Sequence, residues 1–178
     1  MHNLPYPDRL YFRAAEGWLG LGDTVAAAEE LDKITSQFHT HPEVRVLRWF
    51  LLAHAQKWEE ALLLAEGIAQ AFPGSPRGWI QICKTLKCMG RVQQAYDLAM
   101  RKLEHFAEHW EFFYDAACYA CLLGKRVEAE MCLLNAIVLG NAKMVTRLAI
   151  ADPDLKTLWK PIGSCRLKLY KRASRLHA

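Results

Sequence analysis

The chain has 178 residues, of which 52% are hydrophobic and 24% charged, and its formal net charge is +4. This length suits one domain with a sizeable core, and this composition excludes the intrinsically disordered class. No run approaches the roughly 18 apolar residues that cross a membrane, and the first residues, MHNLPYPDRL, lack the basic start and apolar stretch of an export signal. We therefore expect no membrane span and a cytoplasmic protein.

Taken in chain order, the sequence predicts pairs of helices with a period of 34 residues. An alanine recurs at that interval, at Ala27, Ala61, Ala95 and Ala129. Five residues before these alanines lie Gly22, Gln56, Gly90 and Gly124, and glycine is typical of the point where a helix ends and the chain reverses. A second helical pattern lies upstream in each unit and is clearest in the third, with spacings i, i+3, i+4, i+7 at Trp79, Ile82, Cys83 and Leu86.

The predicted unit is thus a helix hairpin, and four hairpins fall at about 8–41, 42–75, 76–109 and 110–141. Two helices of about 12 to 14 residues with short connections give this period, and one hairpin cannot bury its apolar face alone. Stacking is required, and the recurring alanines with Gly22, Gly90 and Gly124 are predicted to serve close packing. The fold class is all-α, an α-solenoid of stacked antiparallel helix hairpins without a sheet.

Residues 142–163 are predicted to close the solenoid. Met144, Val145 and Leu148 define the apolar side of an amphipathic helix that would cover the last hairpin. Asp152 can then cap, and Pro153 can start, a short second helix that places Leu155, Leu158 and Trp159 on one face. We expect residues 1–163 to form a single solenoid, followed by a basic arm at 164–178.

Residues 8 to about 141 resemble the tetratricopeptide repeat (TPR) family. In register, the aromatic column of that family holds Tyr11, Arg45, Trp79 and Phe113, and its small-residue column holds Ala15, Trp49, Cys83 and Ala117. The closing proline is present once, as Pro73. The second repeat departs most, because Arg45, Arg48 and Trp49 stand where smaller or apolar residues are usual. The resemblance implies a right-handed TPR-like superhelix with four repeats.

Such folds bind an extended peptide or a partner helix on the concave surface formed by the first helices. By register, that surface is predicted to hold Arg9, Phe12, Arg13, Glu16, Val46, Leu47, Phe50, Arg77, Ile80, Gln81, Lys84, Lys87, Trp110, Tyr114, Asp115 and Cys118. Aromatic residues beside Arg13, Lys84 and Lys87 suit a ligand with apolar anchors and a carboxylate. The alternative is that the lysines form a solvated face and the aromatics belong to the core.

The carboxylate clamp of some TPR proteins is not expected here. Its positions hold Phe12, Glu16, Leu47, Arg77 and Gln81, of which only Arg77 has a suitable charge. Other peptide modes stay open, as does a small chaperone for secreted or assembled subunits. The leading hypothesis is a non-enzymatic scaffold that binds a protein or peptide of unknown identity, with a homodimer as a further option.

Two motifs could bind a metal, and both are better explained otherwise. His105, Glu108 and His109 match the HxxEH spacing of zinc hydrolases, but they straddle the junction of two hairpins and lack an obvious third ligand. Cys118 and Cys121 form a CxxC inside a predicted helix, where cysteine is a common small buried residue. We expect no catalytic residue, no metal and no cofactor.

The charge distribution supplies an alternative function. Through Asp154 there are 16 basic residues against 19 acidic ones, whereas from Leu155 onward there are seven basic residues and no acid. The basic arm at 164–178, which holds five of these seven residues, could make a weak contact with nucleic acid or an anionic surface. The chain would then be a nucleic-acid-associated adaptor.

Overall fold

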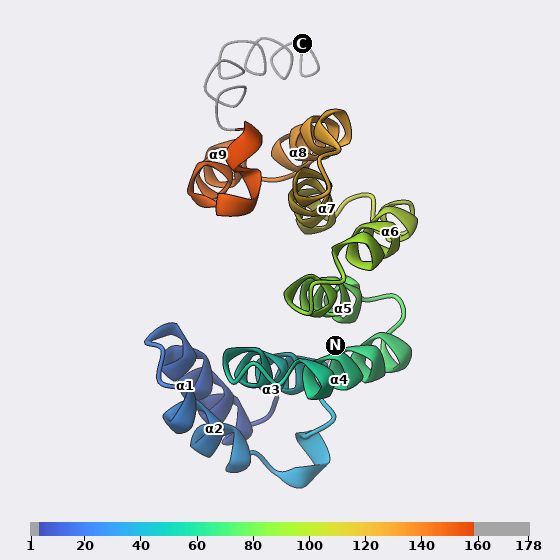
Figure 1. The fold of residues 1–178 in the computed structure, drawn as a ribbon. Helices are drawn as coiled ribbons and strands as arrows, with labels where there is room; N and C mark the ends of the chain where they lie inside the picture. The colour runs from blue at the N-terminus through green and yellow to red at the C-terminus, as the bar shows by residue number, and fades with distance from the viewer. Residues whose placement is uncertain (1–3, 159–178) are drawn as a thin grey trace. The chain divides into compact units, whose positions relative to one another are not determined.

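The computed structural model describes residues 4–158, and between those residues every regular element is a helix. The chain divides into two compact units, Met1–Thr85 and Leu86–Ala178. The first unit holds α1 (Asp8–Gly20), α2 (Thr24–Asp32), the 3-10 helix η1 (Ser36–Phe38), α3 (Pro42–His54), α4 (Trp58–Ala71) and most of α5 (Pro76–Cys88). The second holds the end of α5, then α6 (Val92–Leu103), α7 (Trp110–Leu122), α8 (Arg126–Leu139), α9 (Ala142–Ala151) and the 3-10 helix η2 (Pro153–Leu158) (Figure 1).

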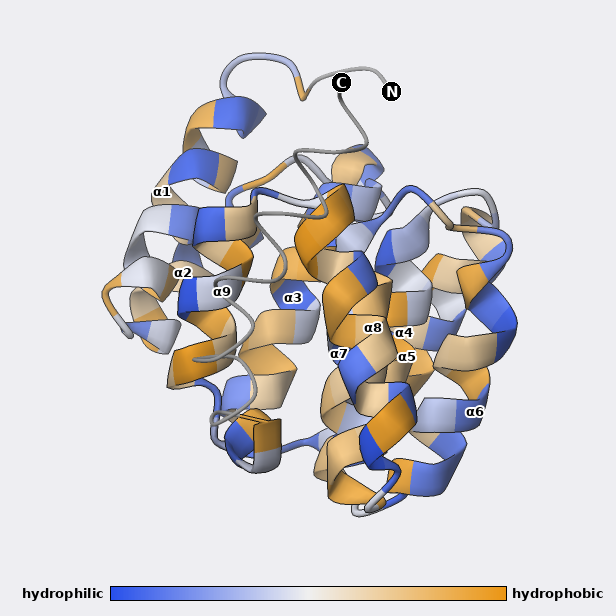
Figure 2. Ribbon diagram, turned by 90° about the horizontal axis from the view of Figure 1, so that it is seen from above, coloured by the Kyte–Doolittle hydropathy of each residue, from blue (hydrophilic) through white to orange (hydrophobic). Residues whose placement is uncertain are grey.

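Consecutive helices pack as hairpins, as predicted. In the first unit α1 packs on α2 and α3 on α4, and in the second unit α7 packs on α8. The first helices α1, α3, α5 and α7 begin at residues 8, 42, 76 and 110, so the 34-residue period of the sequence is also the period of the structure. Each labelled helix carries both hydrophobic and hydrophilic residues (Figure 2), which fits elements that bury one side against a neighbour.

The hairpin turns use left-handed backbone at four equivalent positions. Gly22, Gly90 and Gly124 have φ values of +82°, +76° and +71°. The fourth position holds Gln56, whose φ is +56°. A side chain in this region is disfavoured because its Cβ approaches the following carbonyl oxygen, so the second hairpin makes the same turn with a strained residue.

Small residues allow the helices to approach closely. Ala27, Ala61, Ala95 and Ala129 are all fully buried. Gly78 of α5 lies directly against α4, because a Cβ at this residue would be 2.5 Å from the backbone nitrogen of Ala69 and 2.8 Å from its Cα. Such a separation is too short for any side chain, so this crossing requires glycine.

The unusual residues of the second repeat are accommodated by polar contacts. Arg45 donates to the carbonyl oxygen of Gly67 (3.1 Å), and Arg48 donates to the carboxylate of Asp32 (3.0 Å). Trp49 is buried, and its indole Nε1 donates to the Thr85 hydroxyl at 3.0 Å. Buried polar groups require partners of this kind, so these residues tie α3 to α2, α4 and α5.

The closing element differs from the prediction in one respect. The buried residues of α9 are Val145 and Ala149, whereas Met144 and Leu148 are exposed, so the predicted covering face was wrong for those two side chains. The short second helix is present: the Asp152 Oδ1 atom accepts from the Asp154 backbone N–H at 2.9 Å, and Leu155 and Leu158 are buried. Trp159 and the basic arm lie outside the described residues.

Candidate protein-binding site

In the first unit, the residues predicted to bind a partner lie on its first helices. Two contacts align α3 with α5: the ion pair between Glu43 and Arg77 (3.4 Å), and the hydrogen bond between Trp49 and Thr85 (3.0 Å). These pairs are 34 and 36 residues apart in sequence. Residues one repeat apart therefore occupy neighbouring positions, and α1 also packs on α3. We define the first-helix face by Arg9, Phe12, Arg13, Glu16, Val46, Phe50, Arg77, Ile80, Gln81 and Lys84.

The apolar part of the first-helix face is only partly accessible. The side chain of Phe50 is 41% exposed and meets Trp49 edge-on, with ring centroids 5.1 Å apart. Val46 and Ile80 are half-buried. Phe12 and Gln81 are buried, as is Leu47, and these residues contribute mainly to the interior. Of the two phenylalanines on this face, Phe50 is therefore the accessible one.

The charged part of the face is already paired within the chain. Arg77 lies 3.4 Å from Glu43, and Arg13 lies 3.3 Å from Glu16. Because all four side chains are substantially exposed, each ion pair contributes no more than about 1 kcal/mol. A ligand carboxylate can replace Glu43 or Glu16 at little energetic cost. Arg9 and Lys84 are exposed on the same face.

The predicted residues of the second unit meet the chain's own aspartates. The Tyr114 hydroxyl donates to Asp152 Oδ2 at 2.9 Å, and the Cys118 sulfur lies 3.5 Å from the same oxygen. Lys87 forms an ion pair with Asp154. Trp110 contacts Tyr114 edge-on with ring centroids 6.1 Å apart, and Asp115 is half-buried. Of the basic residues predicted to face a ligand carboxylate, Lys87 is therefore paired with a carboxylate of the chain itself.

Burial and charge shift the pKa values of this cluster. Burial of the ammonium lowers the pKa of Lys87, but the hydrogen bond and charge of Asp154 outweigh this effect, so the net pKa is raised. Burial raises the pKa of the Tyr114 hydroxyl well above its usual range. Burial, followed by the charge of Asp152, does the same to the pKa of the Cys118 thiol. Tyr114 and Cys118 are therefore neutral hydrogen-bond donors toward Asp152.

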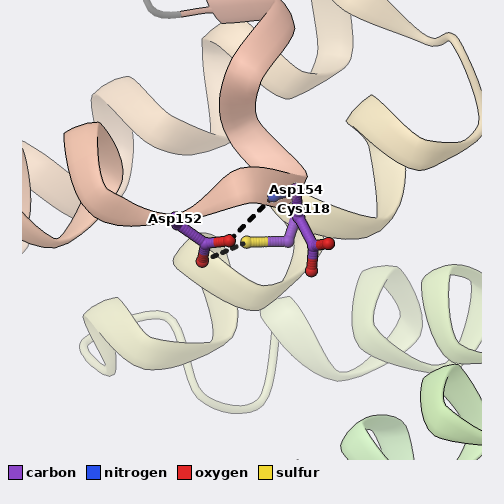
Figure 3. Close-up of side chains that lie close together, drawn as sticks. All are labelled: Cys118, Asp152 and Asp154. Atoms are coloured by element: carbon purple, nitrogen blue, oxygen red, sulfur yellow. Dashed lines mark hydrogen bonds between the residues drawn. The ribbon is translucent and has the colours of Figure 1, made fainter.

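Cys118, Asp152 and Asp154 lie close enough to be considered as metal ligands (Figure 3), because one ligand atom from each falls within 4.8 Å of the others. Their surroundings favour a hydrogen-bonded cluster instead. Tyr114 donates to Asp152, the Cys118 sulfur lies 3.5 Å from the same oxygen, and Lys87 neutralises Asp154, so both carboxylates already have partners within the chain.

The HxxEH motif lies in a connection between helices. The helix α6 ends at Leu103 and α7 begins at Trp110, so His105, Glu108 and His109 all fall between them. All three are exposed. The i, i+4 spacing that would place two histidines on one helical face therefore does not apply.

Sequence reasoning did not identify Asp152 and Asp154 as partners of the α7 residues. The repeat pattern relates residues 34 apart, and it carries no information on where the segment after the last repeat returns. The sequence does contain one indication of this pairing. Asp152 and Asp154 lie just before the basic C-terminal stretch that starts at Leu155, and the predicted concave surface includes a lysine, Lys87, with which an aspartate can pair.

Comparisons with known proteins identify the fold. No protein-family model and no curated protein sequence matches the chain. The solved structure of "MamA RS-1 ArsTM double mutant" is similar, with a TM-score of 0.58 and 12% sequence identity over 77% of each chain. MamA is a TPR protein, and the chain has a TPR-like fold. Among the described helices, none is long and apolar enough to cross a bilayer.

Proposed function

We propose that the chain is a non-enzymatic scaffold that binds a segment of a partner protein on the first-helix face of its first unit. The observation that supports the proposal is the exposure of Phe50. This aromatic side chain is 41% exposed, whereas the preceding residue, Trp49, is buried. Exposed aromatic residues in such settings are frequent binding hot spots. Half-buried Val46 and Ile80 extend the apolar contact.

The charges around Phe50 favour a partner segment with acidic residues beside an apolar anchor. Arg77 and Lys84 lie on α5 at the positions equivalent to Glu43 and Phe50 of α3, and Ile80 lies between them along the helix. Since the Arg77–Glu43 pair is exposed and weak, an incoming carboxylate can take over Arg77. Charge complementarity of this kind contributes mainly to specificity and to the rate of association.

The experiment compares two single variants of the intact chain as baits in a lysate of the source organism, treated with nuclease. Phe50→Ser removes the proposed anchor, and Leu63→Ser is the matched control because Leu63 is a 72% exposed apolar residue on the second helix α4. A protein retained by the wild type and by Leu63→Ser, but lost by Phe50→Ser, is then purified and titrated. Equal retention by both variants would reject the first-helix face.

Other expectations from the sequence stay predictions. The basic arm, with its contact to nucleic acid or an anionic surface, lies outside the described residues. A single continuous solenoid, a homodimer, a cytoplasmic location and a chaperone role for assembled subunits are equally open to test. Retention that disappears after nuclease treatment, or on truncation after residue 163, would support the nucleic-acid alternative.

A further inference from the structure

The segment Asp152–Leu158, which we call the strap, lies along the first helix of the last hairpin. It also packs on α8 and α9. Its polar contacts with α7 follow one stripe of that helix, at positions i, i+4 and i+7: Asp152 contacts Tyr114 and Cys118, and the Thr157 hydroxyl lies 3.5 Å from the Cys121 sulfur. The strap therefore runs along α7 in the manner of a bound peptide rather than crossing it at one point.

Both polar and apolar contacts hold the strap in its place on the second unit. Asp154 is paired with Lys87, the last basic residue of α5, and Asp152 uses both carboxylate oxygens: Oδ2 accepts from Tyr114, and Oδ1 accepts from the Asp154 backbone N–H. Leu155 and Leu158, one helical turn apart, are fully buried. The occupied site thus recognises two carboxylates spaced two residues apart, followed by two leucines.

From these contacts we infer that the α7 stripe, together with Lys87, is a second protein-binding site, specific for an acidic, leucine-containing segment, and that the strap occupies it as an internal ligand. All residues of this site belong to the second unit, and the inference does not rest on the first-helix face. Its partner is a protein segment with the chemistry of the strap: aspartate or glutamate toward Tyr114 and Lys87, and leucine in the apolar part.

Tethering explains why such a partner needs the strap to be released first. A segment joined directly to α9 has an effective concentration on the order of millimolar at its own site. A free segment with the same contacts therefore competes only at comparable concentrations, and the site is closed in the isolated chain. Neutralising Asp152 and Asp154 weakens the hydrogen bond from Tyr114, removes the ion pair with Lys87, and so favours release.

The first measurement follows cysteine alkylation in the full chain under native conditions, with the rate at each cysteine resolved by mass spectrometry. In the double variant Asp152→Asn/Asp154→Asn, we expect Cys118 to react at least about tenfold faster than in the wild type. Cys132, buried on α8, reports general unfolding and should keep its rate. Lys156→Gln, at an exposed residue of the strap, is the matched control and should leave both rates unchanged.

The second measurement adds a fluorescent peptide with the sequence of residues 151–158, ADPDLKTL, and records its anisotropy. The double variant should bind the peptide at least about tenfold more tightly than the wild type, and a peptide with both aspartates changed to asparagine should not bind. Adding Tyr114→Phe and Lys87→Gln to the double variant should abolish binding.

Three results would overturn the inference. An unchanged Cys118 rate means that the strap does not leave, and parallel acceleration of Cys118 and Cys132 means that it is an ordinary part of the core. An exposed Cys118 without peptide binding means that α7 does not recognise an acidic segment. Every residue changed or followed in these experiments belongs to the second unit, whereas Phe50 belongs to the first, so failure here is distinct from failure of the Phe50 experiment.

Discussion

The guanidinium of Arg45 donates a hydrogen bond to the carbonyl oxygen of Gly67 across 3.1 Å and occupies the space beside that glycine. A Cβ at residue 67 would lie 2.5 Å from Arg45 Nη2. Arg45 stands in the aromatic column of the repeat, so here a cation bonded to a helix carbonyl replaces an aromatic packing contact. Gly67, inside α4, is the residue that makes room for it.

A double-mutant cycle tests this dependence. Gly67→Ala in the wild type should change the free energy of unfolding little, because the gain in helix propensity, about 0.5–1 kcal/mol, is offset by displacement of Arg45 and loss of a hydrogen bond of similar value. In an Arg45→Ala background, the same change should stabilise by about 0.5–1 kcal/mol. Urea unfolding of the four chains gives the coupling, and additive effects would show that the two residues act independently.

Replacing Gln56 by glycine should stabilise the first unit. Gln56 has a φ of +56°, whereas glycine occupies the equivalent turns at Gly22, Gly90 and Gly124. Removing the Cβ relieves the left-handed strain, and we expect a gain of about 0.5–1 kcal/mol after the greater freedom of glycine in the unfolded chain is subtracted. Thermal unfolding followed by circular dichroism measures it. Gln56→Ala keeps the Cβ and should bring no gain in stability. An equal gain in both variants would show that the Cβ at this left-handed position is not the source of the strain.

Two glycine-to-alanine changes should have opposite signs. Gly78→Ala places a methyl group against the α4 backbone at Ala69, and since backbone cannot move aside cheaply, we expect a loss of about 2 kcal/mol. Gly17→Ala, inside α1, meets no atom within 4 Å and should stabilise by about 0.5–1 kcal/mol through helix propensity. Both are measured by urea unfolding. A loss in both variants would show that open space is not the deciding factor.

Alkaline pH should destabilise the second unit. Burial, and next the charge of Glu128, raises the pKa of the Cys132 thiol from 9.0 to about 11. Between these values the unfolded chain releases this proton while the folded chain keeps it, so the free energy of unfolding falls with rising pH by up to about 1.4 kcal/mol per pH unit from this group. Cys118 and Tyr114, whose pKa values are also raised, act in the same direction.

Urea unfolding at pH 8, 9, 10 and 11, with a reducing agent present, measures the slope. Cys132→Ala should flatten it between pH 9 and 11. Cys88→Ala is the control, because Cys88 is exposed, and its slope should equal that of the wild type. Identical slopes in all three chains would show that Cys132 does not cause the pH dependence.

The period of the sequence was sufficient to predict the hairpins and the starts of their first helices. A repeat pattern places equivalent residues in equivalent local structure, so the turn at Gln56 was found from its place in the series even without a glycine. What the period could not predict was which face of α9 is covered. Val145/Ala149 and Met144/Leu148 have the same i, i+4 spacing, and only the packing of α9 on its neighbours decides between them.

The candidate site was predicted less completely, because some of its contacts come from residues outside the repeats. Register placed Tyr114, Cys118 and Lys87 on the first helices, but their contacts with Asp152 and Asp154 depend on a segment that follows the last repeat. Likewise, the repeat register alone predicted that Phe12 and Phe50 both contact a partner on the first-helix face. Their burial separates them, since Phe12 is buried and Phe50 is not.

The strap also bears on how two copies of the chain can associate. The strap is a short element that packs on α7, α8 and α9 and is joined to α9 at a single point, between Ala151 and Asp152. If that point straightens, the strap of one chain can be seated on α7 of another and reproduce each contact, which is the geometry of a domain-swapped dimer. Such a dimer needs no new interface, so high protein concentration during refolding would be the condition that produces it.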